Sequence, residues 1–183
     1  MSAKKIAVII GSLRKESFNR KTAKALLKLA PDTINLEILE IADLSLYNED
    51  LDSNPPAQWV NFRNKLKTFD GVIFVTPEYN RSFTAVIKNA IDIGSRPYGQ
   101  SVWSGKPGVV ISVSQGTMGG FGANQQIRQT LGFLNIPIMQ QPEAYIGNAA
   151  SWFDQEGNLI NEPTAKFLKG FLDSYAKWVL KNS

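Results

Sequence analysis

Groups that can bind a phosphate are concentrated in residues 11–20, which directly follow a short apolar run. The segment contains the hydroxyls of Ser12 and Ser17, the Asn19 amide and the Arg14 guanidinium. It turns into a predicted helix, and the first N–H groups of a helix lack intrahelical partners and carry roughly half a positive charge. An anion placed there would meet both backbone donors and polar side chains. The pattern predicts a phosphate cradle.

Two common phosphate motifs are missing. The segment lacks the G-x-G-x-x-G fingerprint, and Gly105 and Lys106 do not form a P-loop because Pro107 follows them and a strand comes next. A simpler interpretation is that Ser17 acts only as a helix N-cap and that Arg14 is a solvated charge. The position directly after a predicted strand favours the phosphate cradle.

Residues 76–82 have groups suited to a flat ring. Pro77 stiffens the backbone, Tyr79 offers an aromatic face, and the Asn80 amide and nearby N–H groups can pair with the edge of a heterocycle. Proline, asparagine and serine are also common in ordinary turns, so this segment alone is equally compatible with a plain connection.

A third segment, residues 114–122, contains four glycines among its last seven residues. Glycine lets the backbone approach a planar ligand closely, and its N–H groups can stabilise a developing anion. The alternative is a flexible connection to the following helix. Three such segments at one edge of a sheet favour a ligand site over three unrelated loops.

The absence of cysteine and histidine excludes several kinds of chemistry. Disulfides, thiolate zinc sites, cysteine nucleophiles and Ser-His-Asp triads are ruled out. An acid–base enzyme would depend on Asp, Glu, Lys or Tyr, whereas an enzyme whose cofactor performs the difficult step needs none of them. We therefore predict neither a catalytic side chain nor a metal ligand.

The length of 183 residues, with 43% apolar and 20% charged residues, suits one core and is too short for two typical domains. We expect a single domain over residues 1–183. The longest apolar runs fall far short of the ~20 residues that cross a bilayer, so no membrane span is expected. The basic start at residues 1–5 lacks a small-residue cleavage pattern after it, and we expect a cytoplasmic protein.

The net charge of +4 is unevenly distributed. Residues 1–30 contain eight Lys or Arg and one acidic residue, a net charge of +7. Such a field could attract nucleic acid, an anionic membrane or one small anion. No basic surface interleaved with aromatic residues recurs elsewhere in the sequence, and lysines on the outer face of a helix are usually solvated, so we expect no nucleic-acid partner.

Apolar runs rich in β-branched residues alternate with segments of helical periodicity. Strands are predicted at residues 5–10, 34–41, 71–75, 108–113 and 136–139. Helices are predicted at residues 19–30, 59–69, 84–93, 122–134 and 164–180. Leu27 and Phe167 are among the residues predicted to face the core, and Gly94 is predicted to end the third helix through a positive φ.

This alternation predicts an α/β fold of flavodoxin-like type: a doubly wound sheet of five parallel strands in the order 2-1-3-4-5, with helices on both faces. Ligands in such sheets bind beyond the carboxyl ends of the strands, beside the first strand. The three segments described above follow the first, third and fourth strands, and we expect them to meet there.

The sequence resembles the NADPH-dependent FMN reductase family of flavodoxin-like flavoproteins, which includes bacterial quinone, azo-dye and chromate reductases. The similarity covers about residues 5–145 and is carried by GSLRKESFNR at 11–20, TPEYNRS at 76–82, KNAID at 88–92 and SQGTMGG at 114–120. Each motif is weak alone, and the four in this order are specific.

This resemblance implies FMN as cofactor and assigns residues to it. The phosphate and ribityl chain would be held by Ser12, Arg14, Ser17, Phe18 and Asn19. The isoalloxazine ring would be lined by Pro77, Glu78, Tyr79 and Asn80, and its other edge would contact Ser114 and Gly116. Glu78 would act through its backbone N–H, because a reduced flavin anion would repel the carboxylate.

The activity implied is an NAD(P)H oxidoreductase with NADPH or NADH as co-substrate. By alternating half-reactions, hydride would pass through flavin N5 to a small electron acceptor such as a quinone, free flavin, an azo dye or chromate. A non-enzymatic flavodoxin-like electron carrier or redox sensor is the alternative, although such carriers tend to be acidic and to shield the ring. Family members commonly pack helices near 85–98 and 121–134 into dimers or tetramers, which implies a homodimer or homotetramer here.

Two positions depart from the family pattern. Thr84 and Ala85 stand where members often have Pro-Gly, and Ile93 stands where an aromatic residue is common. The resemblance gives no expectation for the loop shape or pocket wall at these positions, and substrate preference is not transferred.

Overall fold

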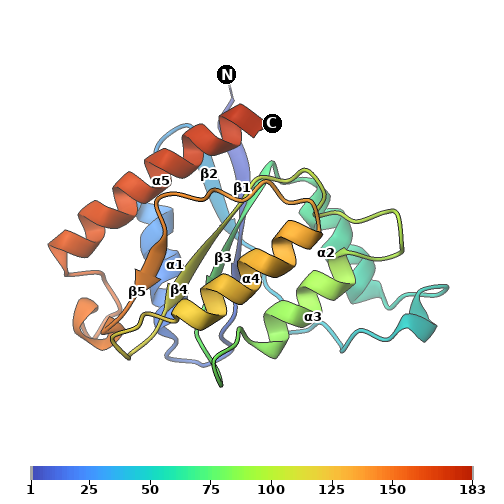
Figure 1. Ribbon diagram of the computed structural model, residues 1–183, viewed down its shortest axis with the longest axis horizontal. Helices are drawn as coiled ribbons and strands as arrows, with labels where there is room; N and C mark the ends of the chain where they lie inside the picture. Colours follow the sequence, from blue (N-terminus) through green and yellow to red (C-terminus); the bar gives the residue numbers. More distant parts are fainter. Residues whose placement is uncertain (1, 183) are drawn as a thin grey trace.

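A five-stranded parallel sheet forms the centre of the computed structural model, which describes residues 2–182 (Figure 1). All neighbouring strands in the order β2-β1-β3-β4-β5 pair in parallel. The predicted flavodoxin-like topology is confirmed. The strand bounds are Lys4–Ile10 (β1), Ile34–Ile38 (β2), Gly71–Thr76 (β3), Gly108–Val113 (β4) and Ala144–Ile146 (β5).

Helices cover both faces of this sheet (Figure 1). One face carries α1 and α5, and the other carries α2, α3 and α4. Two short 3₁₀ turns lie at Glu49–Leu51 and Ala149–Trp152. The helix bounds are Phe18–Leu29 (α1), Ala57–Lys67 (α2), Ala85–Gly94 (α3), Phe121–Phe133 (α4) and Glu162–Asn182 (α5).

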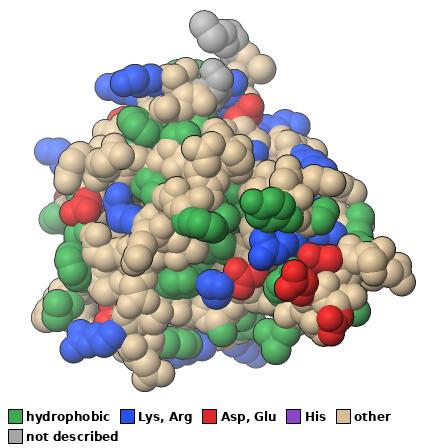
Figure 2. Space-filling model, turned by 45° about the vertical axis from the view of Figure 1, so that its right-hand side comes forward, with side chains coloured by type: hydrophobic (Ala, Val, Ile, Leu, Met, Phe, Trp, Pro, Cys, Tyr) green, Lys and Arg blue, Asp and Glu red, His purple; other side chains and the backbone are tan. Residues whose placement is uncertain are grey.

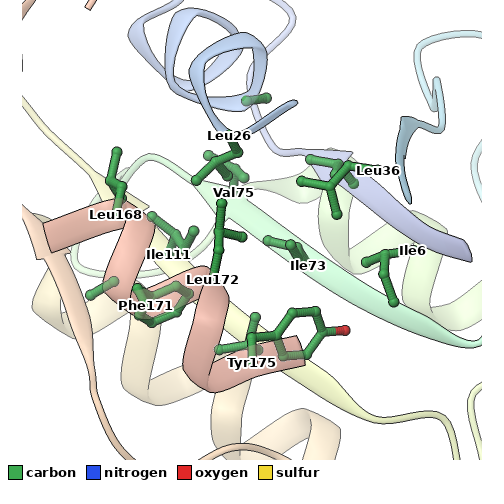
Figure 3. Packing of buried hydrophobic residues seen from close by; sticks show 14 of the residues in the cluster. Ile6, Leu26, Leu36, Ile73, Val75, Ile111, Leu168, Phe171, Leu172 and Tyr175 are labelled. Carbon is green, nitrogen blue, oxygen red and sulfur yellow. The ribbon is translucent and has the colours of Figure 1, made fainter. Parts of the chain in front are cut away.

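Apart from Thr76 and Ser112, β3 and β4 contain only apolar residues, because both faces of these strands are buried. In β1, Ile6, Val8 and Ile10 pack in the cluster beneath α1 and α5, whereas Ala7 and Ile9 pack beneath the other three helices. Figure 3 shows the first cluster, where side chains of α1 and α5 meet those of β1, β3 and β4. The alternation fixes which residue at each strand end faces which layer.

The fifth strand was predicted at residues 136–139 and lies instead at Ala144–Ile146. The predicted segment does run beside β4, but it bonds only to Gly108, through the Pro137 carbonyl and the Met139 N–H at 3.0 Å each. Two side chains also bond to carbonyls of this segment. Trp178 Nε1 donates to the Pro137 carbonyl, and Arg128 donates to the Met139 carbonyl. The chain pairs with β4 again only at Ala144, five residues after Met139.

Three expectations about single residues are wrong. Leu27 and Phe167 are 39% and 42% exposed. Each is the immediate neighbour of a fully buried leucine, and the turn of about 100° per helical residue carries it out to solvent. Gly94 does not adopt a positive φ. A glycine fits at this position because there is no room for a side chain: a Cβ there would lie 2.4 Å from Nε1 of Trp103.

The amino edge of the sheet is closed by α5. The Tyr175 hydroxyl donates to the carbonyl oxygens of Val72 and Pro107, 3.0 Å from each, and burial raises the pKa of this phenol. At this edge β1 begins and α5 ends (Figure 1). Among residues 2–182, no helix has both the length and the apolar character needed to cross a membrane.

Candidate cofactor site

Three loops at the carboxyl edge of the sheet meet around one cavity. The loop after β1 is tied to β3 by the Gly11 N–H, which donates to the Val75 carbonyl at 2.8 Å. The loop after β4 is tied to β5 by the Ser114 N–H, which donates to the Ile146 carbonyl at 2.8 Å. The cavity has a volume of 170 Å³, and its lining includes nine of the eleven predicted residues: Ser12, Arg14, Ser17, Phe18, Asn19, Pro77, Glu78, Tyr79 and Ser114.

The first end of the cavity is built on the start of α1. Ser17 is the N-cap of this helix, and its Oγ accepts a hydrogen bond from the Arg20 N–H at 3.2 Å. The simple interpretation of Ser17 is therefore correct, and the same residue also lines the cavity. Ser12 and Asn19 are 3% and 4% exposed, and the Asn19 Oδ1 has no hydrogen-bond partner among the described residues. A buried amide oxygen without a partner costs about 1–3 kcal/mol, so this oxygen is ready for a donor from a ligand.

The basic residues near this end differ in how they are engaged. Arg20 donates to both carboxylate oxygens of Glu40 at 2.7 and 2.8 Å, and these bonds lower the pKa of Glu40. Lys21 lies 3.6 Å from Glu16. Arg14 is exposed and forms no ion pair with any residue in the range 2–182. Its guanidinium is thus the one available at the cavity for an anion.

The second end of the cavity is formed by a tight turn after β3. The Tyr79 N–H donates to the Ser82 carbonyl at 2.9 Å, and the Ser82 N–H returns a bond to the Tyr79 carbonyl at 3.0 Å. Between them, Asn80 and Arg81 adopt positive φ angles of 52° and 65°, as a type I′ turn requires. Tyr79 is 50% exposed and lines the cavity, whereas Asn80 lies outside its lining. A contact between Asn80 and a ring stays a prediction.

Glycines in the loop after β4 allow this loop to pack closely against neighbouring parts of the protein. Gly119 has a φ of 59°, and a Cβ there would lie 2.6 Å from the Tyr145 backbone of β5. Gly120 follows with a φ of 74° as the N-cap of α4. Gly116 is exposed and outside the cavity lining, and the Ser114 Oγ accepts its N–H at 3.1 Å. Its contact with a ligand also stays a prediction.

The Glu78 side chain points to α4. Its Oε2 accepts the Ala123 N–H at 3.1 Å, and its Oε1 lies 3.6 Å from a guanidinium nitrogen of Arg81. The expectation that this residue presents its backbone to a ligand is compatible with such an arrangement, because the carboxylate is held by a helix start and a cation.

The sequence profile of the NADPH-dependent FMN reductase family matches residues 4–151. The chain belongs to this family. A quinone reductase of Pseudomonas putida is 58% identical over 178 residues, which cover 97% of this chain and 95% of the relative. A 2-hydroxy-1,4-benzoquinone reductase of a Burkholderia species is 46% identical over 177 residues, which cover 97% of each chain. The solved structure of FerB, a flavoenzyme NAD(P)H:(acceptor) oxidoreductase from Paracoccus denitrificans, has a TM-score of 0.92 at 42% identity, covering 98% of this chain and 99% of FerB.

FMN, the cofactor of this reductase family, fits the groups around the cavity. A ribityl hydroxyl can donate to the unpartnered Asn19 Oδ1, which a phosphate dianion cannot do. The phosphate matches the Arg14 guanidinium and the start of α1. At 170 Å³ the cavity is smaller than the roughly 300 Å³ of an enclosed ligand pocket, so it suits the phosphate and ribityl chain and leaves the ring against the open loops.

The structure shows where two residues that depart from the FMN reductase pattern lie. Thr84 is the N-cap residue of α3 but makes no capping bond through its side chain, and its buried hydroxyl has no partner among the described residues. Ile93 is fully buried in the core beneath α2, α3 and α4, so it does not form a pocket wall. Sequence reasoning missed Val113 and Gln115 in the lining, although both flank the predicted Ser114.

A larger hollow of 810 Å³ lies between α3 and α4 and contains none of the eleven predicted residues. Within residues 2–182, no group of three or more acidic, His or Cys side chains could hold a metal ion. Near the start of α4, burial and Glu143 raise the pKa of Tyr145 to about 12, so this phenol keeps its proton at neutral pH.

Proposed function

We propose that this chain is an FMN-dependent NAD(P)H:quinone oxidoreductase. The observation that carries the proposal is the cavity at the carboxyl edge, with an unpartnered buried amide oxygen at Asn19 and an unpaired guanidinium at Arg14. Its ring side is open, because Tyr79 is half exposed. Relatives named for quinone reduction at 58% and 46% identity support a quinone as the acceptor.

The protein's part in this reaction is to bind, orient and expose. FMN, when bound, supplies two-electron chemistry between a nicotinamide and a quinone. Arg14, Ser12 and Asn19 would hold the phosphate and ribityl chain, and the loops after β3 and β4 would support the ring. Reduction of a quinone by NAD(P)H consumes one proton, which water can supply at an open face. No side chain acts as an acid in this proposal.

The test is a visible absorption spectrum of the protein reconstituted with FMN, followed without oxygen as NADPH or NADH and then a quinone are added. Flavin that stays bound, bleaches with the nucleotide and recovers with the quinone is the expected result. Bound flavin that neither nucleotide bleaches would favour an electron carrier or redox sensor. Failure to retain flavin would overturn the proposal.

We also propose that the enzyme is a homodimer or homotetramer that uses α3 and α4. Phe133 at the end of α4 is 90% exposed and lines the 810 Å³ hollow with Phe83 and Lys88. Figure 2 turns the side with α2 and α3 forward and shows hydrophobic side chains exposed among charged ones. Light scattering should give a dimer or tetramer for the native chain and smaller particles for F133D, with F167D as the control for an exposed phenylalanine elsewhere. A monomeric native chain would refute this proposal.

The proposed location is the cytoplasm. The nicotinamide nucleotides that would donate electrons are cytoplasmic metabolites, which supports this placement. Cell fractionation with an antibody to the chain would check it, and recovery from another compartment would contradict it.

A further inference from the structure

We infer that the Glu78 carboxylate is a positioning group that fixes one wall of the cofactor site, the turn after β3, to the start of α4, which lies outside the cavity lining. The inference rests on the proposed function for its ligand, FMN. It concerns a side chain that the sequence motif alone assigns only a backbone role.

The first observation is that α4 has no cap of its own. Its N-cap residue is Gly120, which has no side chain, whereas α1 is capped by the neighbouring Ser17. For α4 the acceptor comes from a residue 45 positions earlier, because Oε2 of Glu78 accepts the Ala123 N–H at 3.1 Å. A carboxylate at a helix start is also favoured by the helix dipole.

The second observation is that the turn after β3 packs closely against the start of α4. A Cβ on Gly122 would lie 3.0 Å from Oε2 of Glu78 and 2.9 Å from the Arg81 carbonyl oxygen. One turn further along, Gln126 donates to that same carbonyl at 3.0 Å and accepts the Ser82 hydroxyl at 2.6 Å. The turn after β3 is therefore docked on the first two turns of α4.

Glu78 differs from Gln126, which makes the other contacts, in its position relative to the cofactor cavity. Its side chain is only 14% exposed, and the residue lines the cofactor cavity, as its neighbours Pro77 and Tyr79 also do. Gln126 lies outside that lining. Removing the Glu78 carboxylate would thus release the wall next to the ligand, whereas the outer contacts would keep the turn attached.

The experiment measures FMN binding and the visible circular dichroism of bound flavin, and it needs no turnover. E78A is expected to raise the FMN dissociation constant about 5- to 30-fold, the upper part of the range expected for loss of a helix cap, and to change the flavin dichroism. E78Q keeps an acceptor oxygen and is expected to stay within about 3-fold of the native value.

Two further variants separate positioning from general stability. N161A removes the side chain that accepts the Thr164 N–H at the start of α5, and this residue is outside the cavity lining. It is expected to lower the melting temperature much as E78A does, with FMN binding and dichroism unchanged. G122A adds a methyl group between the turn after β3 and the start of α4. It is expected to weaken FMN binding although the Glu78 carboxylate is still present.

The outcomes are distinct. E78A with native FMN affinity and native dichroism would overturn the inference while leaving the proposed function standing. If E78A does not fold, native FMN affinity and dichroism in G122A would overturn the inference instead. A native chain that binds no FMN would overturn both proposals.

Discussion

The two ends of the cofactor cavity are constructed differently. The phosphate end comes from one stretch of chain, where Ser17 caps the helix that follows it and buried Ser12 and Asn19 lie close by in sequence. The ring end combines the loops that follow β3 and β4. Glu78, in the first of these loops, accepts a hydrogen bond from the Ala123 N–H at the start of α4, the helix that follows the second loop. The phosphate end can therefore form with α1 itself, whereas the ring end depends on contacts across the fold. We expect most of the FMN affinity at the first end and most of the adjustable geometry at the second.

The largest effect should follow from removing both polar anchors of the phosphate end. The double variant R14A/N19A is expected to weaken FMN binding roughly 100-fold, because a hydrogen bond from Arg14 to the charged phosphate contributes about 1.5–3 kcal/mol and a neutral bond from a ribityl hydroxyl to Asn19 contributes about 0.5–1.5 kcal/mol. Titration of the apoprotein with FMN would measure it. K24A is the matched control, since Lys24 is an exposed cation of α1 outside the cavity lining. Equal affinity of the double variant and the native chain would remove the distinction between the two ends.

A smaller effect is expected at the ring end. Y79A removes a half-exposed aromatic face and should weaken FMN binding about 2- to 10-fold, because an aromatic pair contributes about 0.5–1.5 kcal/mol. Y79F keeps the ring and should bind FMN like the native chain. A loss in Y79A as large as that in R14A/N19A would show that the ring end anchors the cofactor as strongly as the phosphate end.

The smallest effect on FMN should come from Tyr175, at the opposite edge of the sheet. Y175F should leave FMN affinity unchanged but lower the free energy of unfolding by about 1 kcal/mol, because the Val72 and Pro107 carbonyls lose the hydrogen bonds from the Tyr175 hydroxyl. A weaker FMN affinity in Y175F would mean that the two edges are coupled.

Tyr175 also predicts a dependence on pH. Burial raises its pKa above the ordinary value of a tyrosine, about 10, in the folded chain, so above about pH 10 the unfolded chain releases a proton that the folded chain keeps. Stability should then fall as pH rises. Y175F should reduce this slope by up to about 1.4 kcal/mol per pH unit, measured by urea unfolding between about pH 9 and 11. Identical slopes for the two proteins would contradict the assignment.

Local sequence patterns predicted most of the fold. They also singled out the residues after β1 that line the cavity, and the contact of these residues with a phosphate stays a prediction. The central strands are apolar runs buried on both faces, and residues 11–20 carry their helix start within the motif itself. The fifth strand was misplaced because residues 136–139 are also apolar and also lie beside β4, at Gly108. Only the side-chain bonds of Arg128 and Trp178 show why no ladder forms there.

The ring end was less predictable because its key contacts join residues far apart in sequence. The glycines after β4 suggested a flat ligand, yet the nearest neighbour of Gly119 is the backbone at Tyr145, in a strand that was placed elsewhere. The role of the Glu78 side chain depends on a helix start 45 residues away. Neither contact can be predicted from a local sequence pattern, because its two partners lie far apart in the sequence.

The location of the start of β1 and the end of α5 at the amino edge has a practical consequence. The cavity proposed for FMN lies at the opposite, carboxyl edge, so a tag, linker or gold-binding peptide fused before β1 or after α5 would leave it unobstructed. A chain attached to an electrode through its last helix would present the cavity to the solution, and a soluble quinone could then carry current between the surface and the tethered protein.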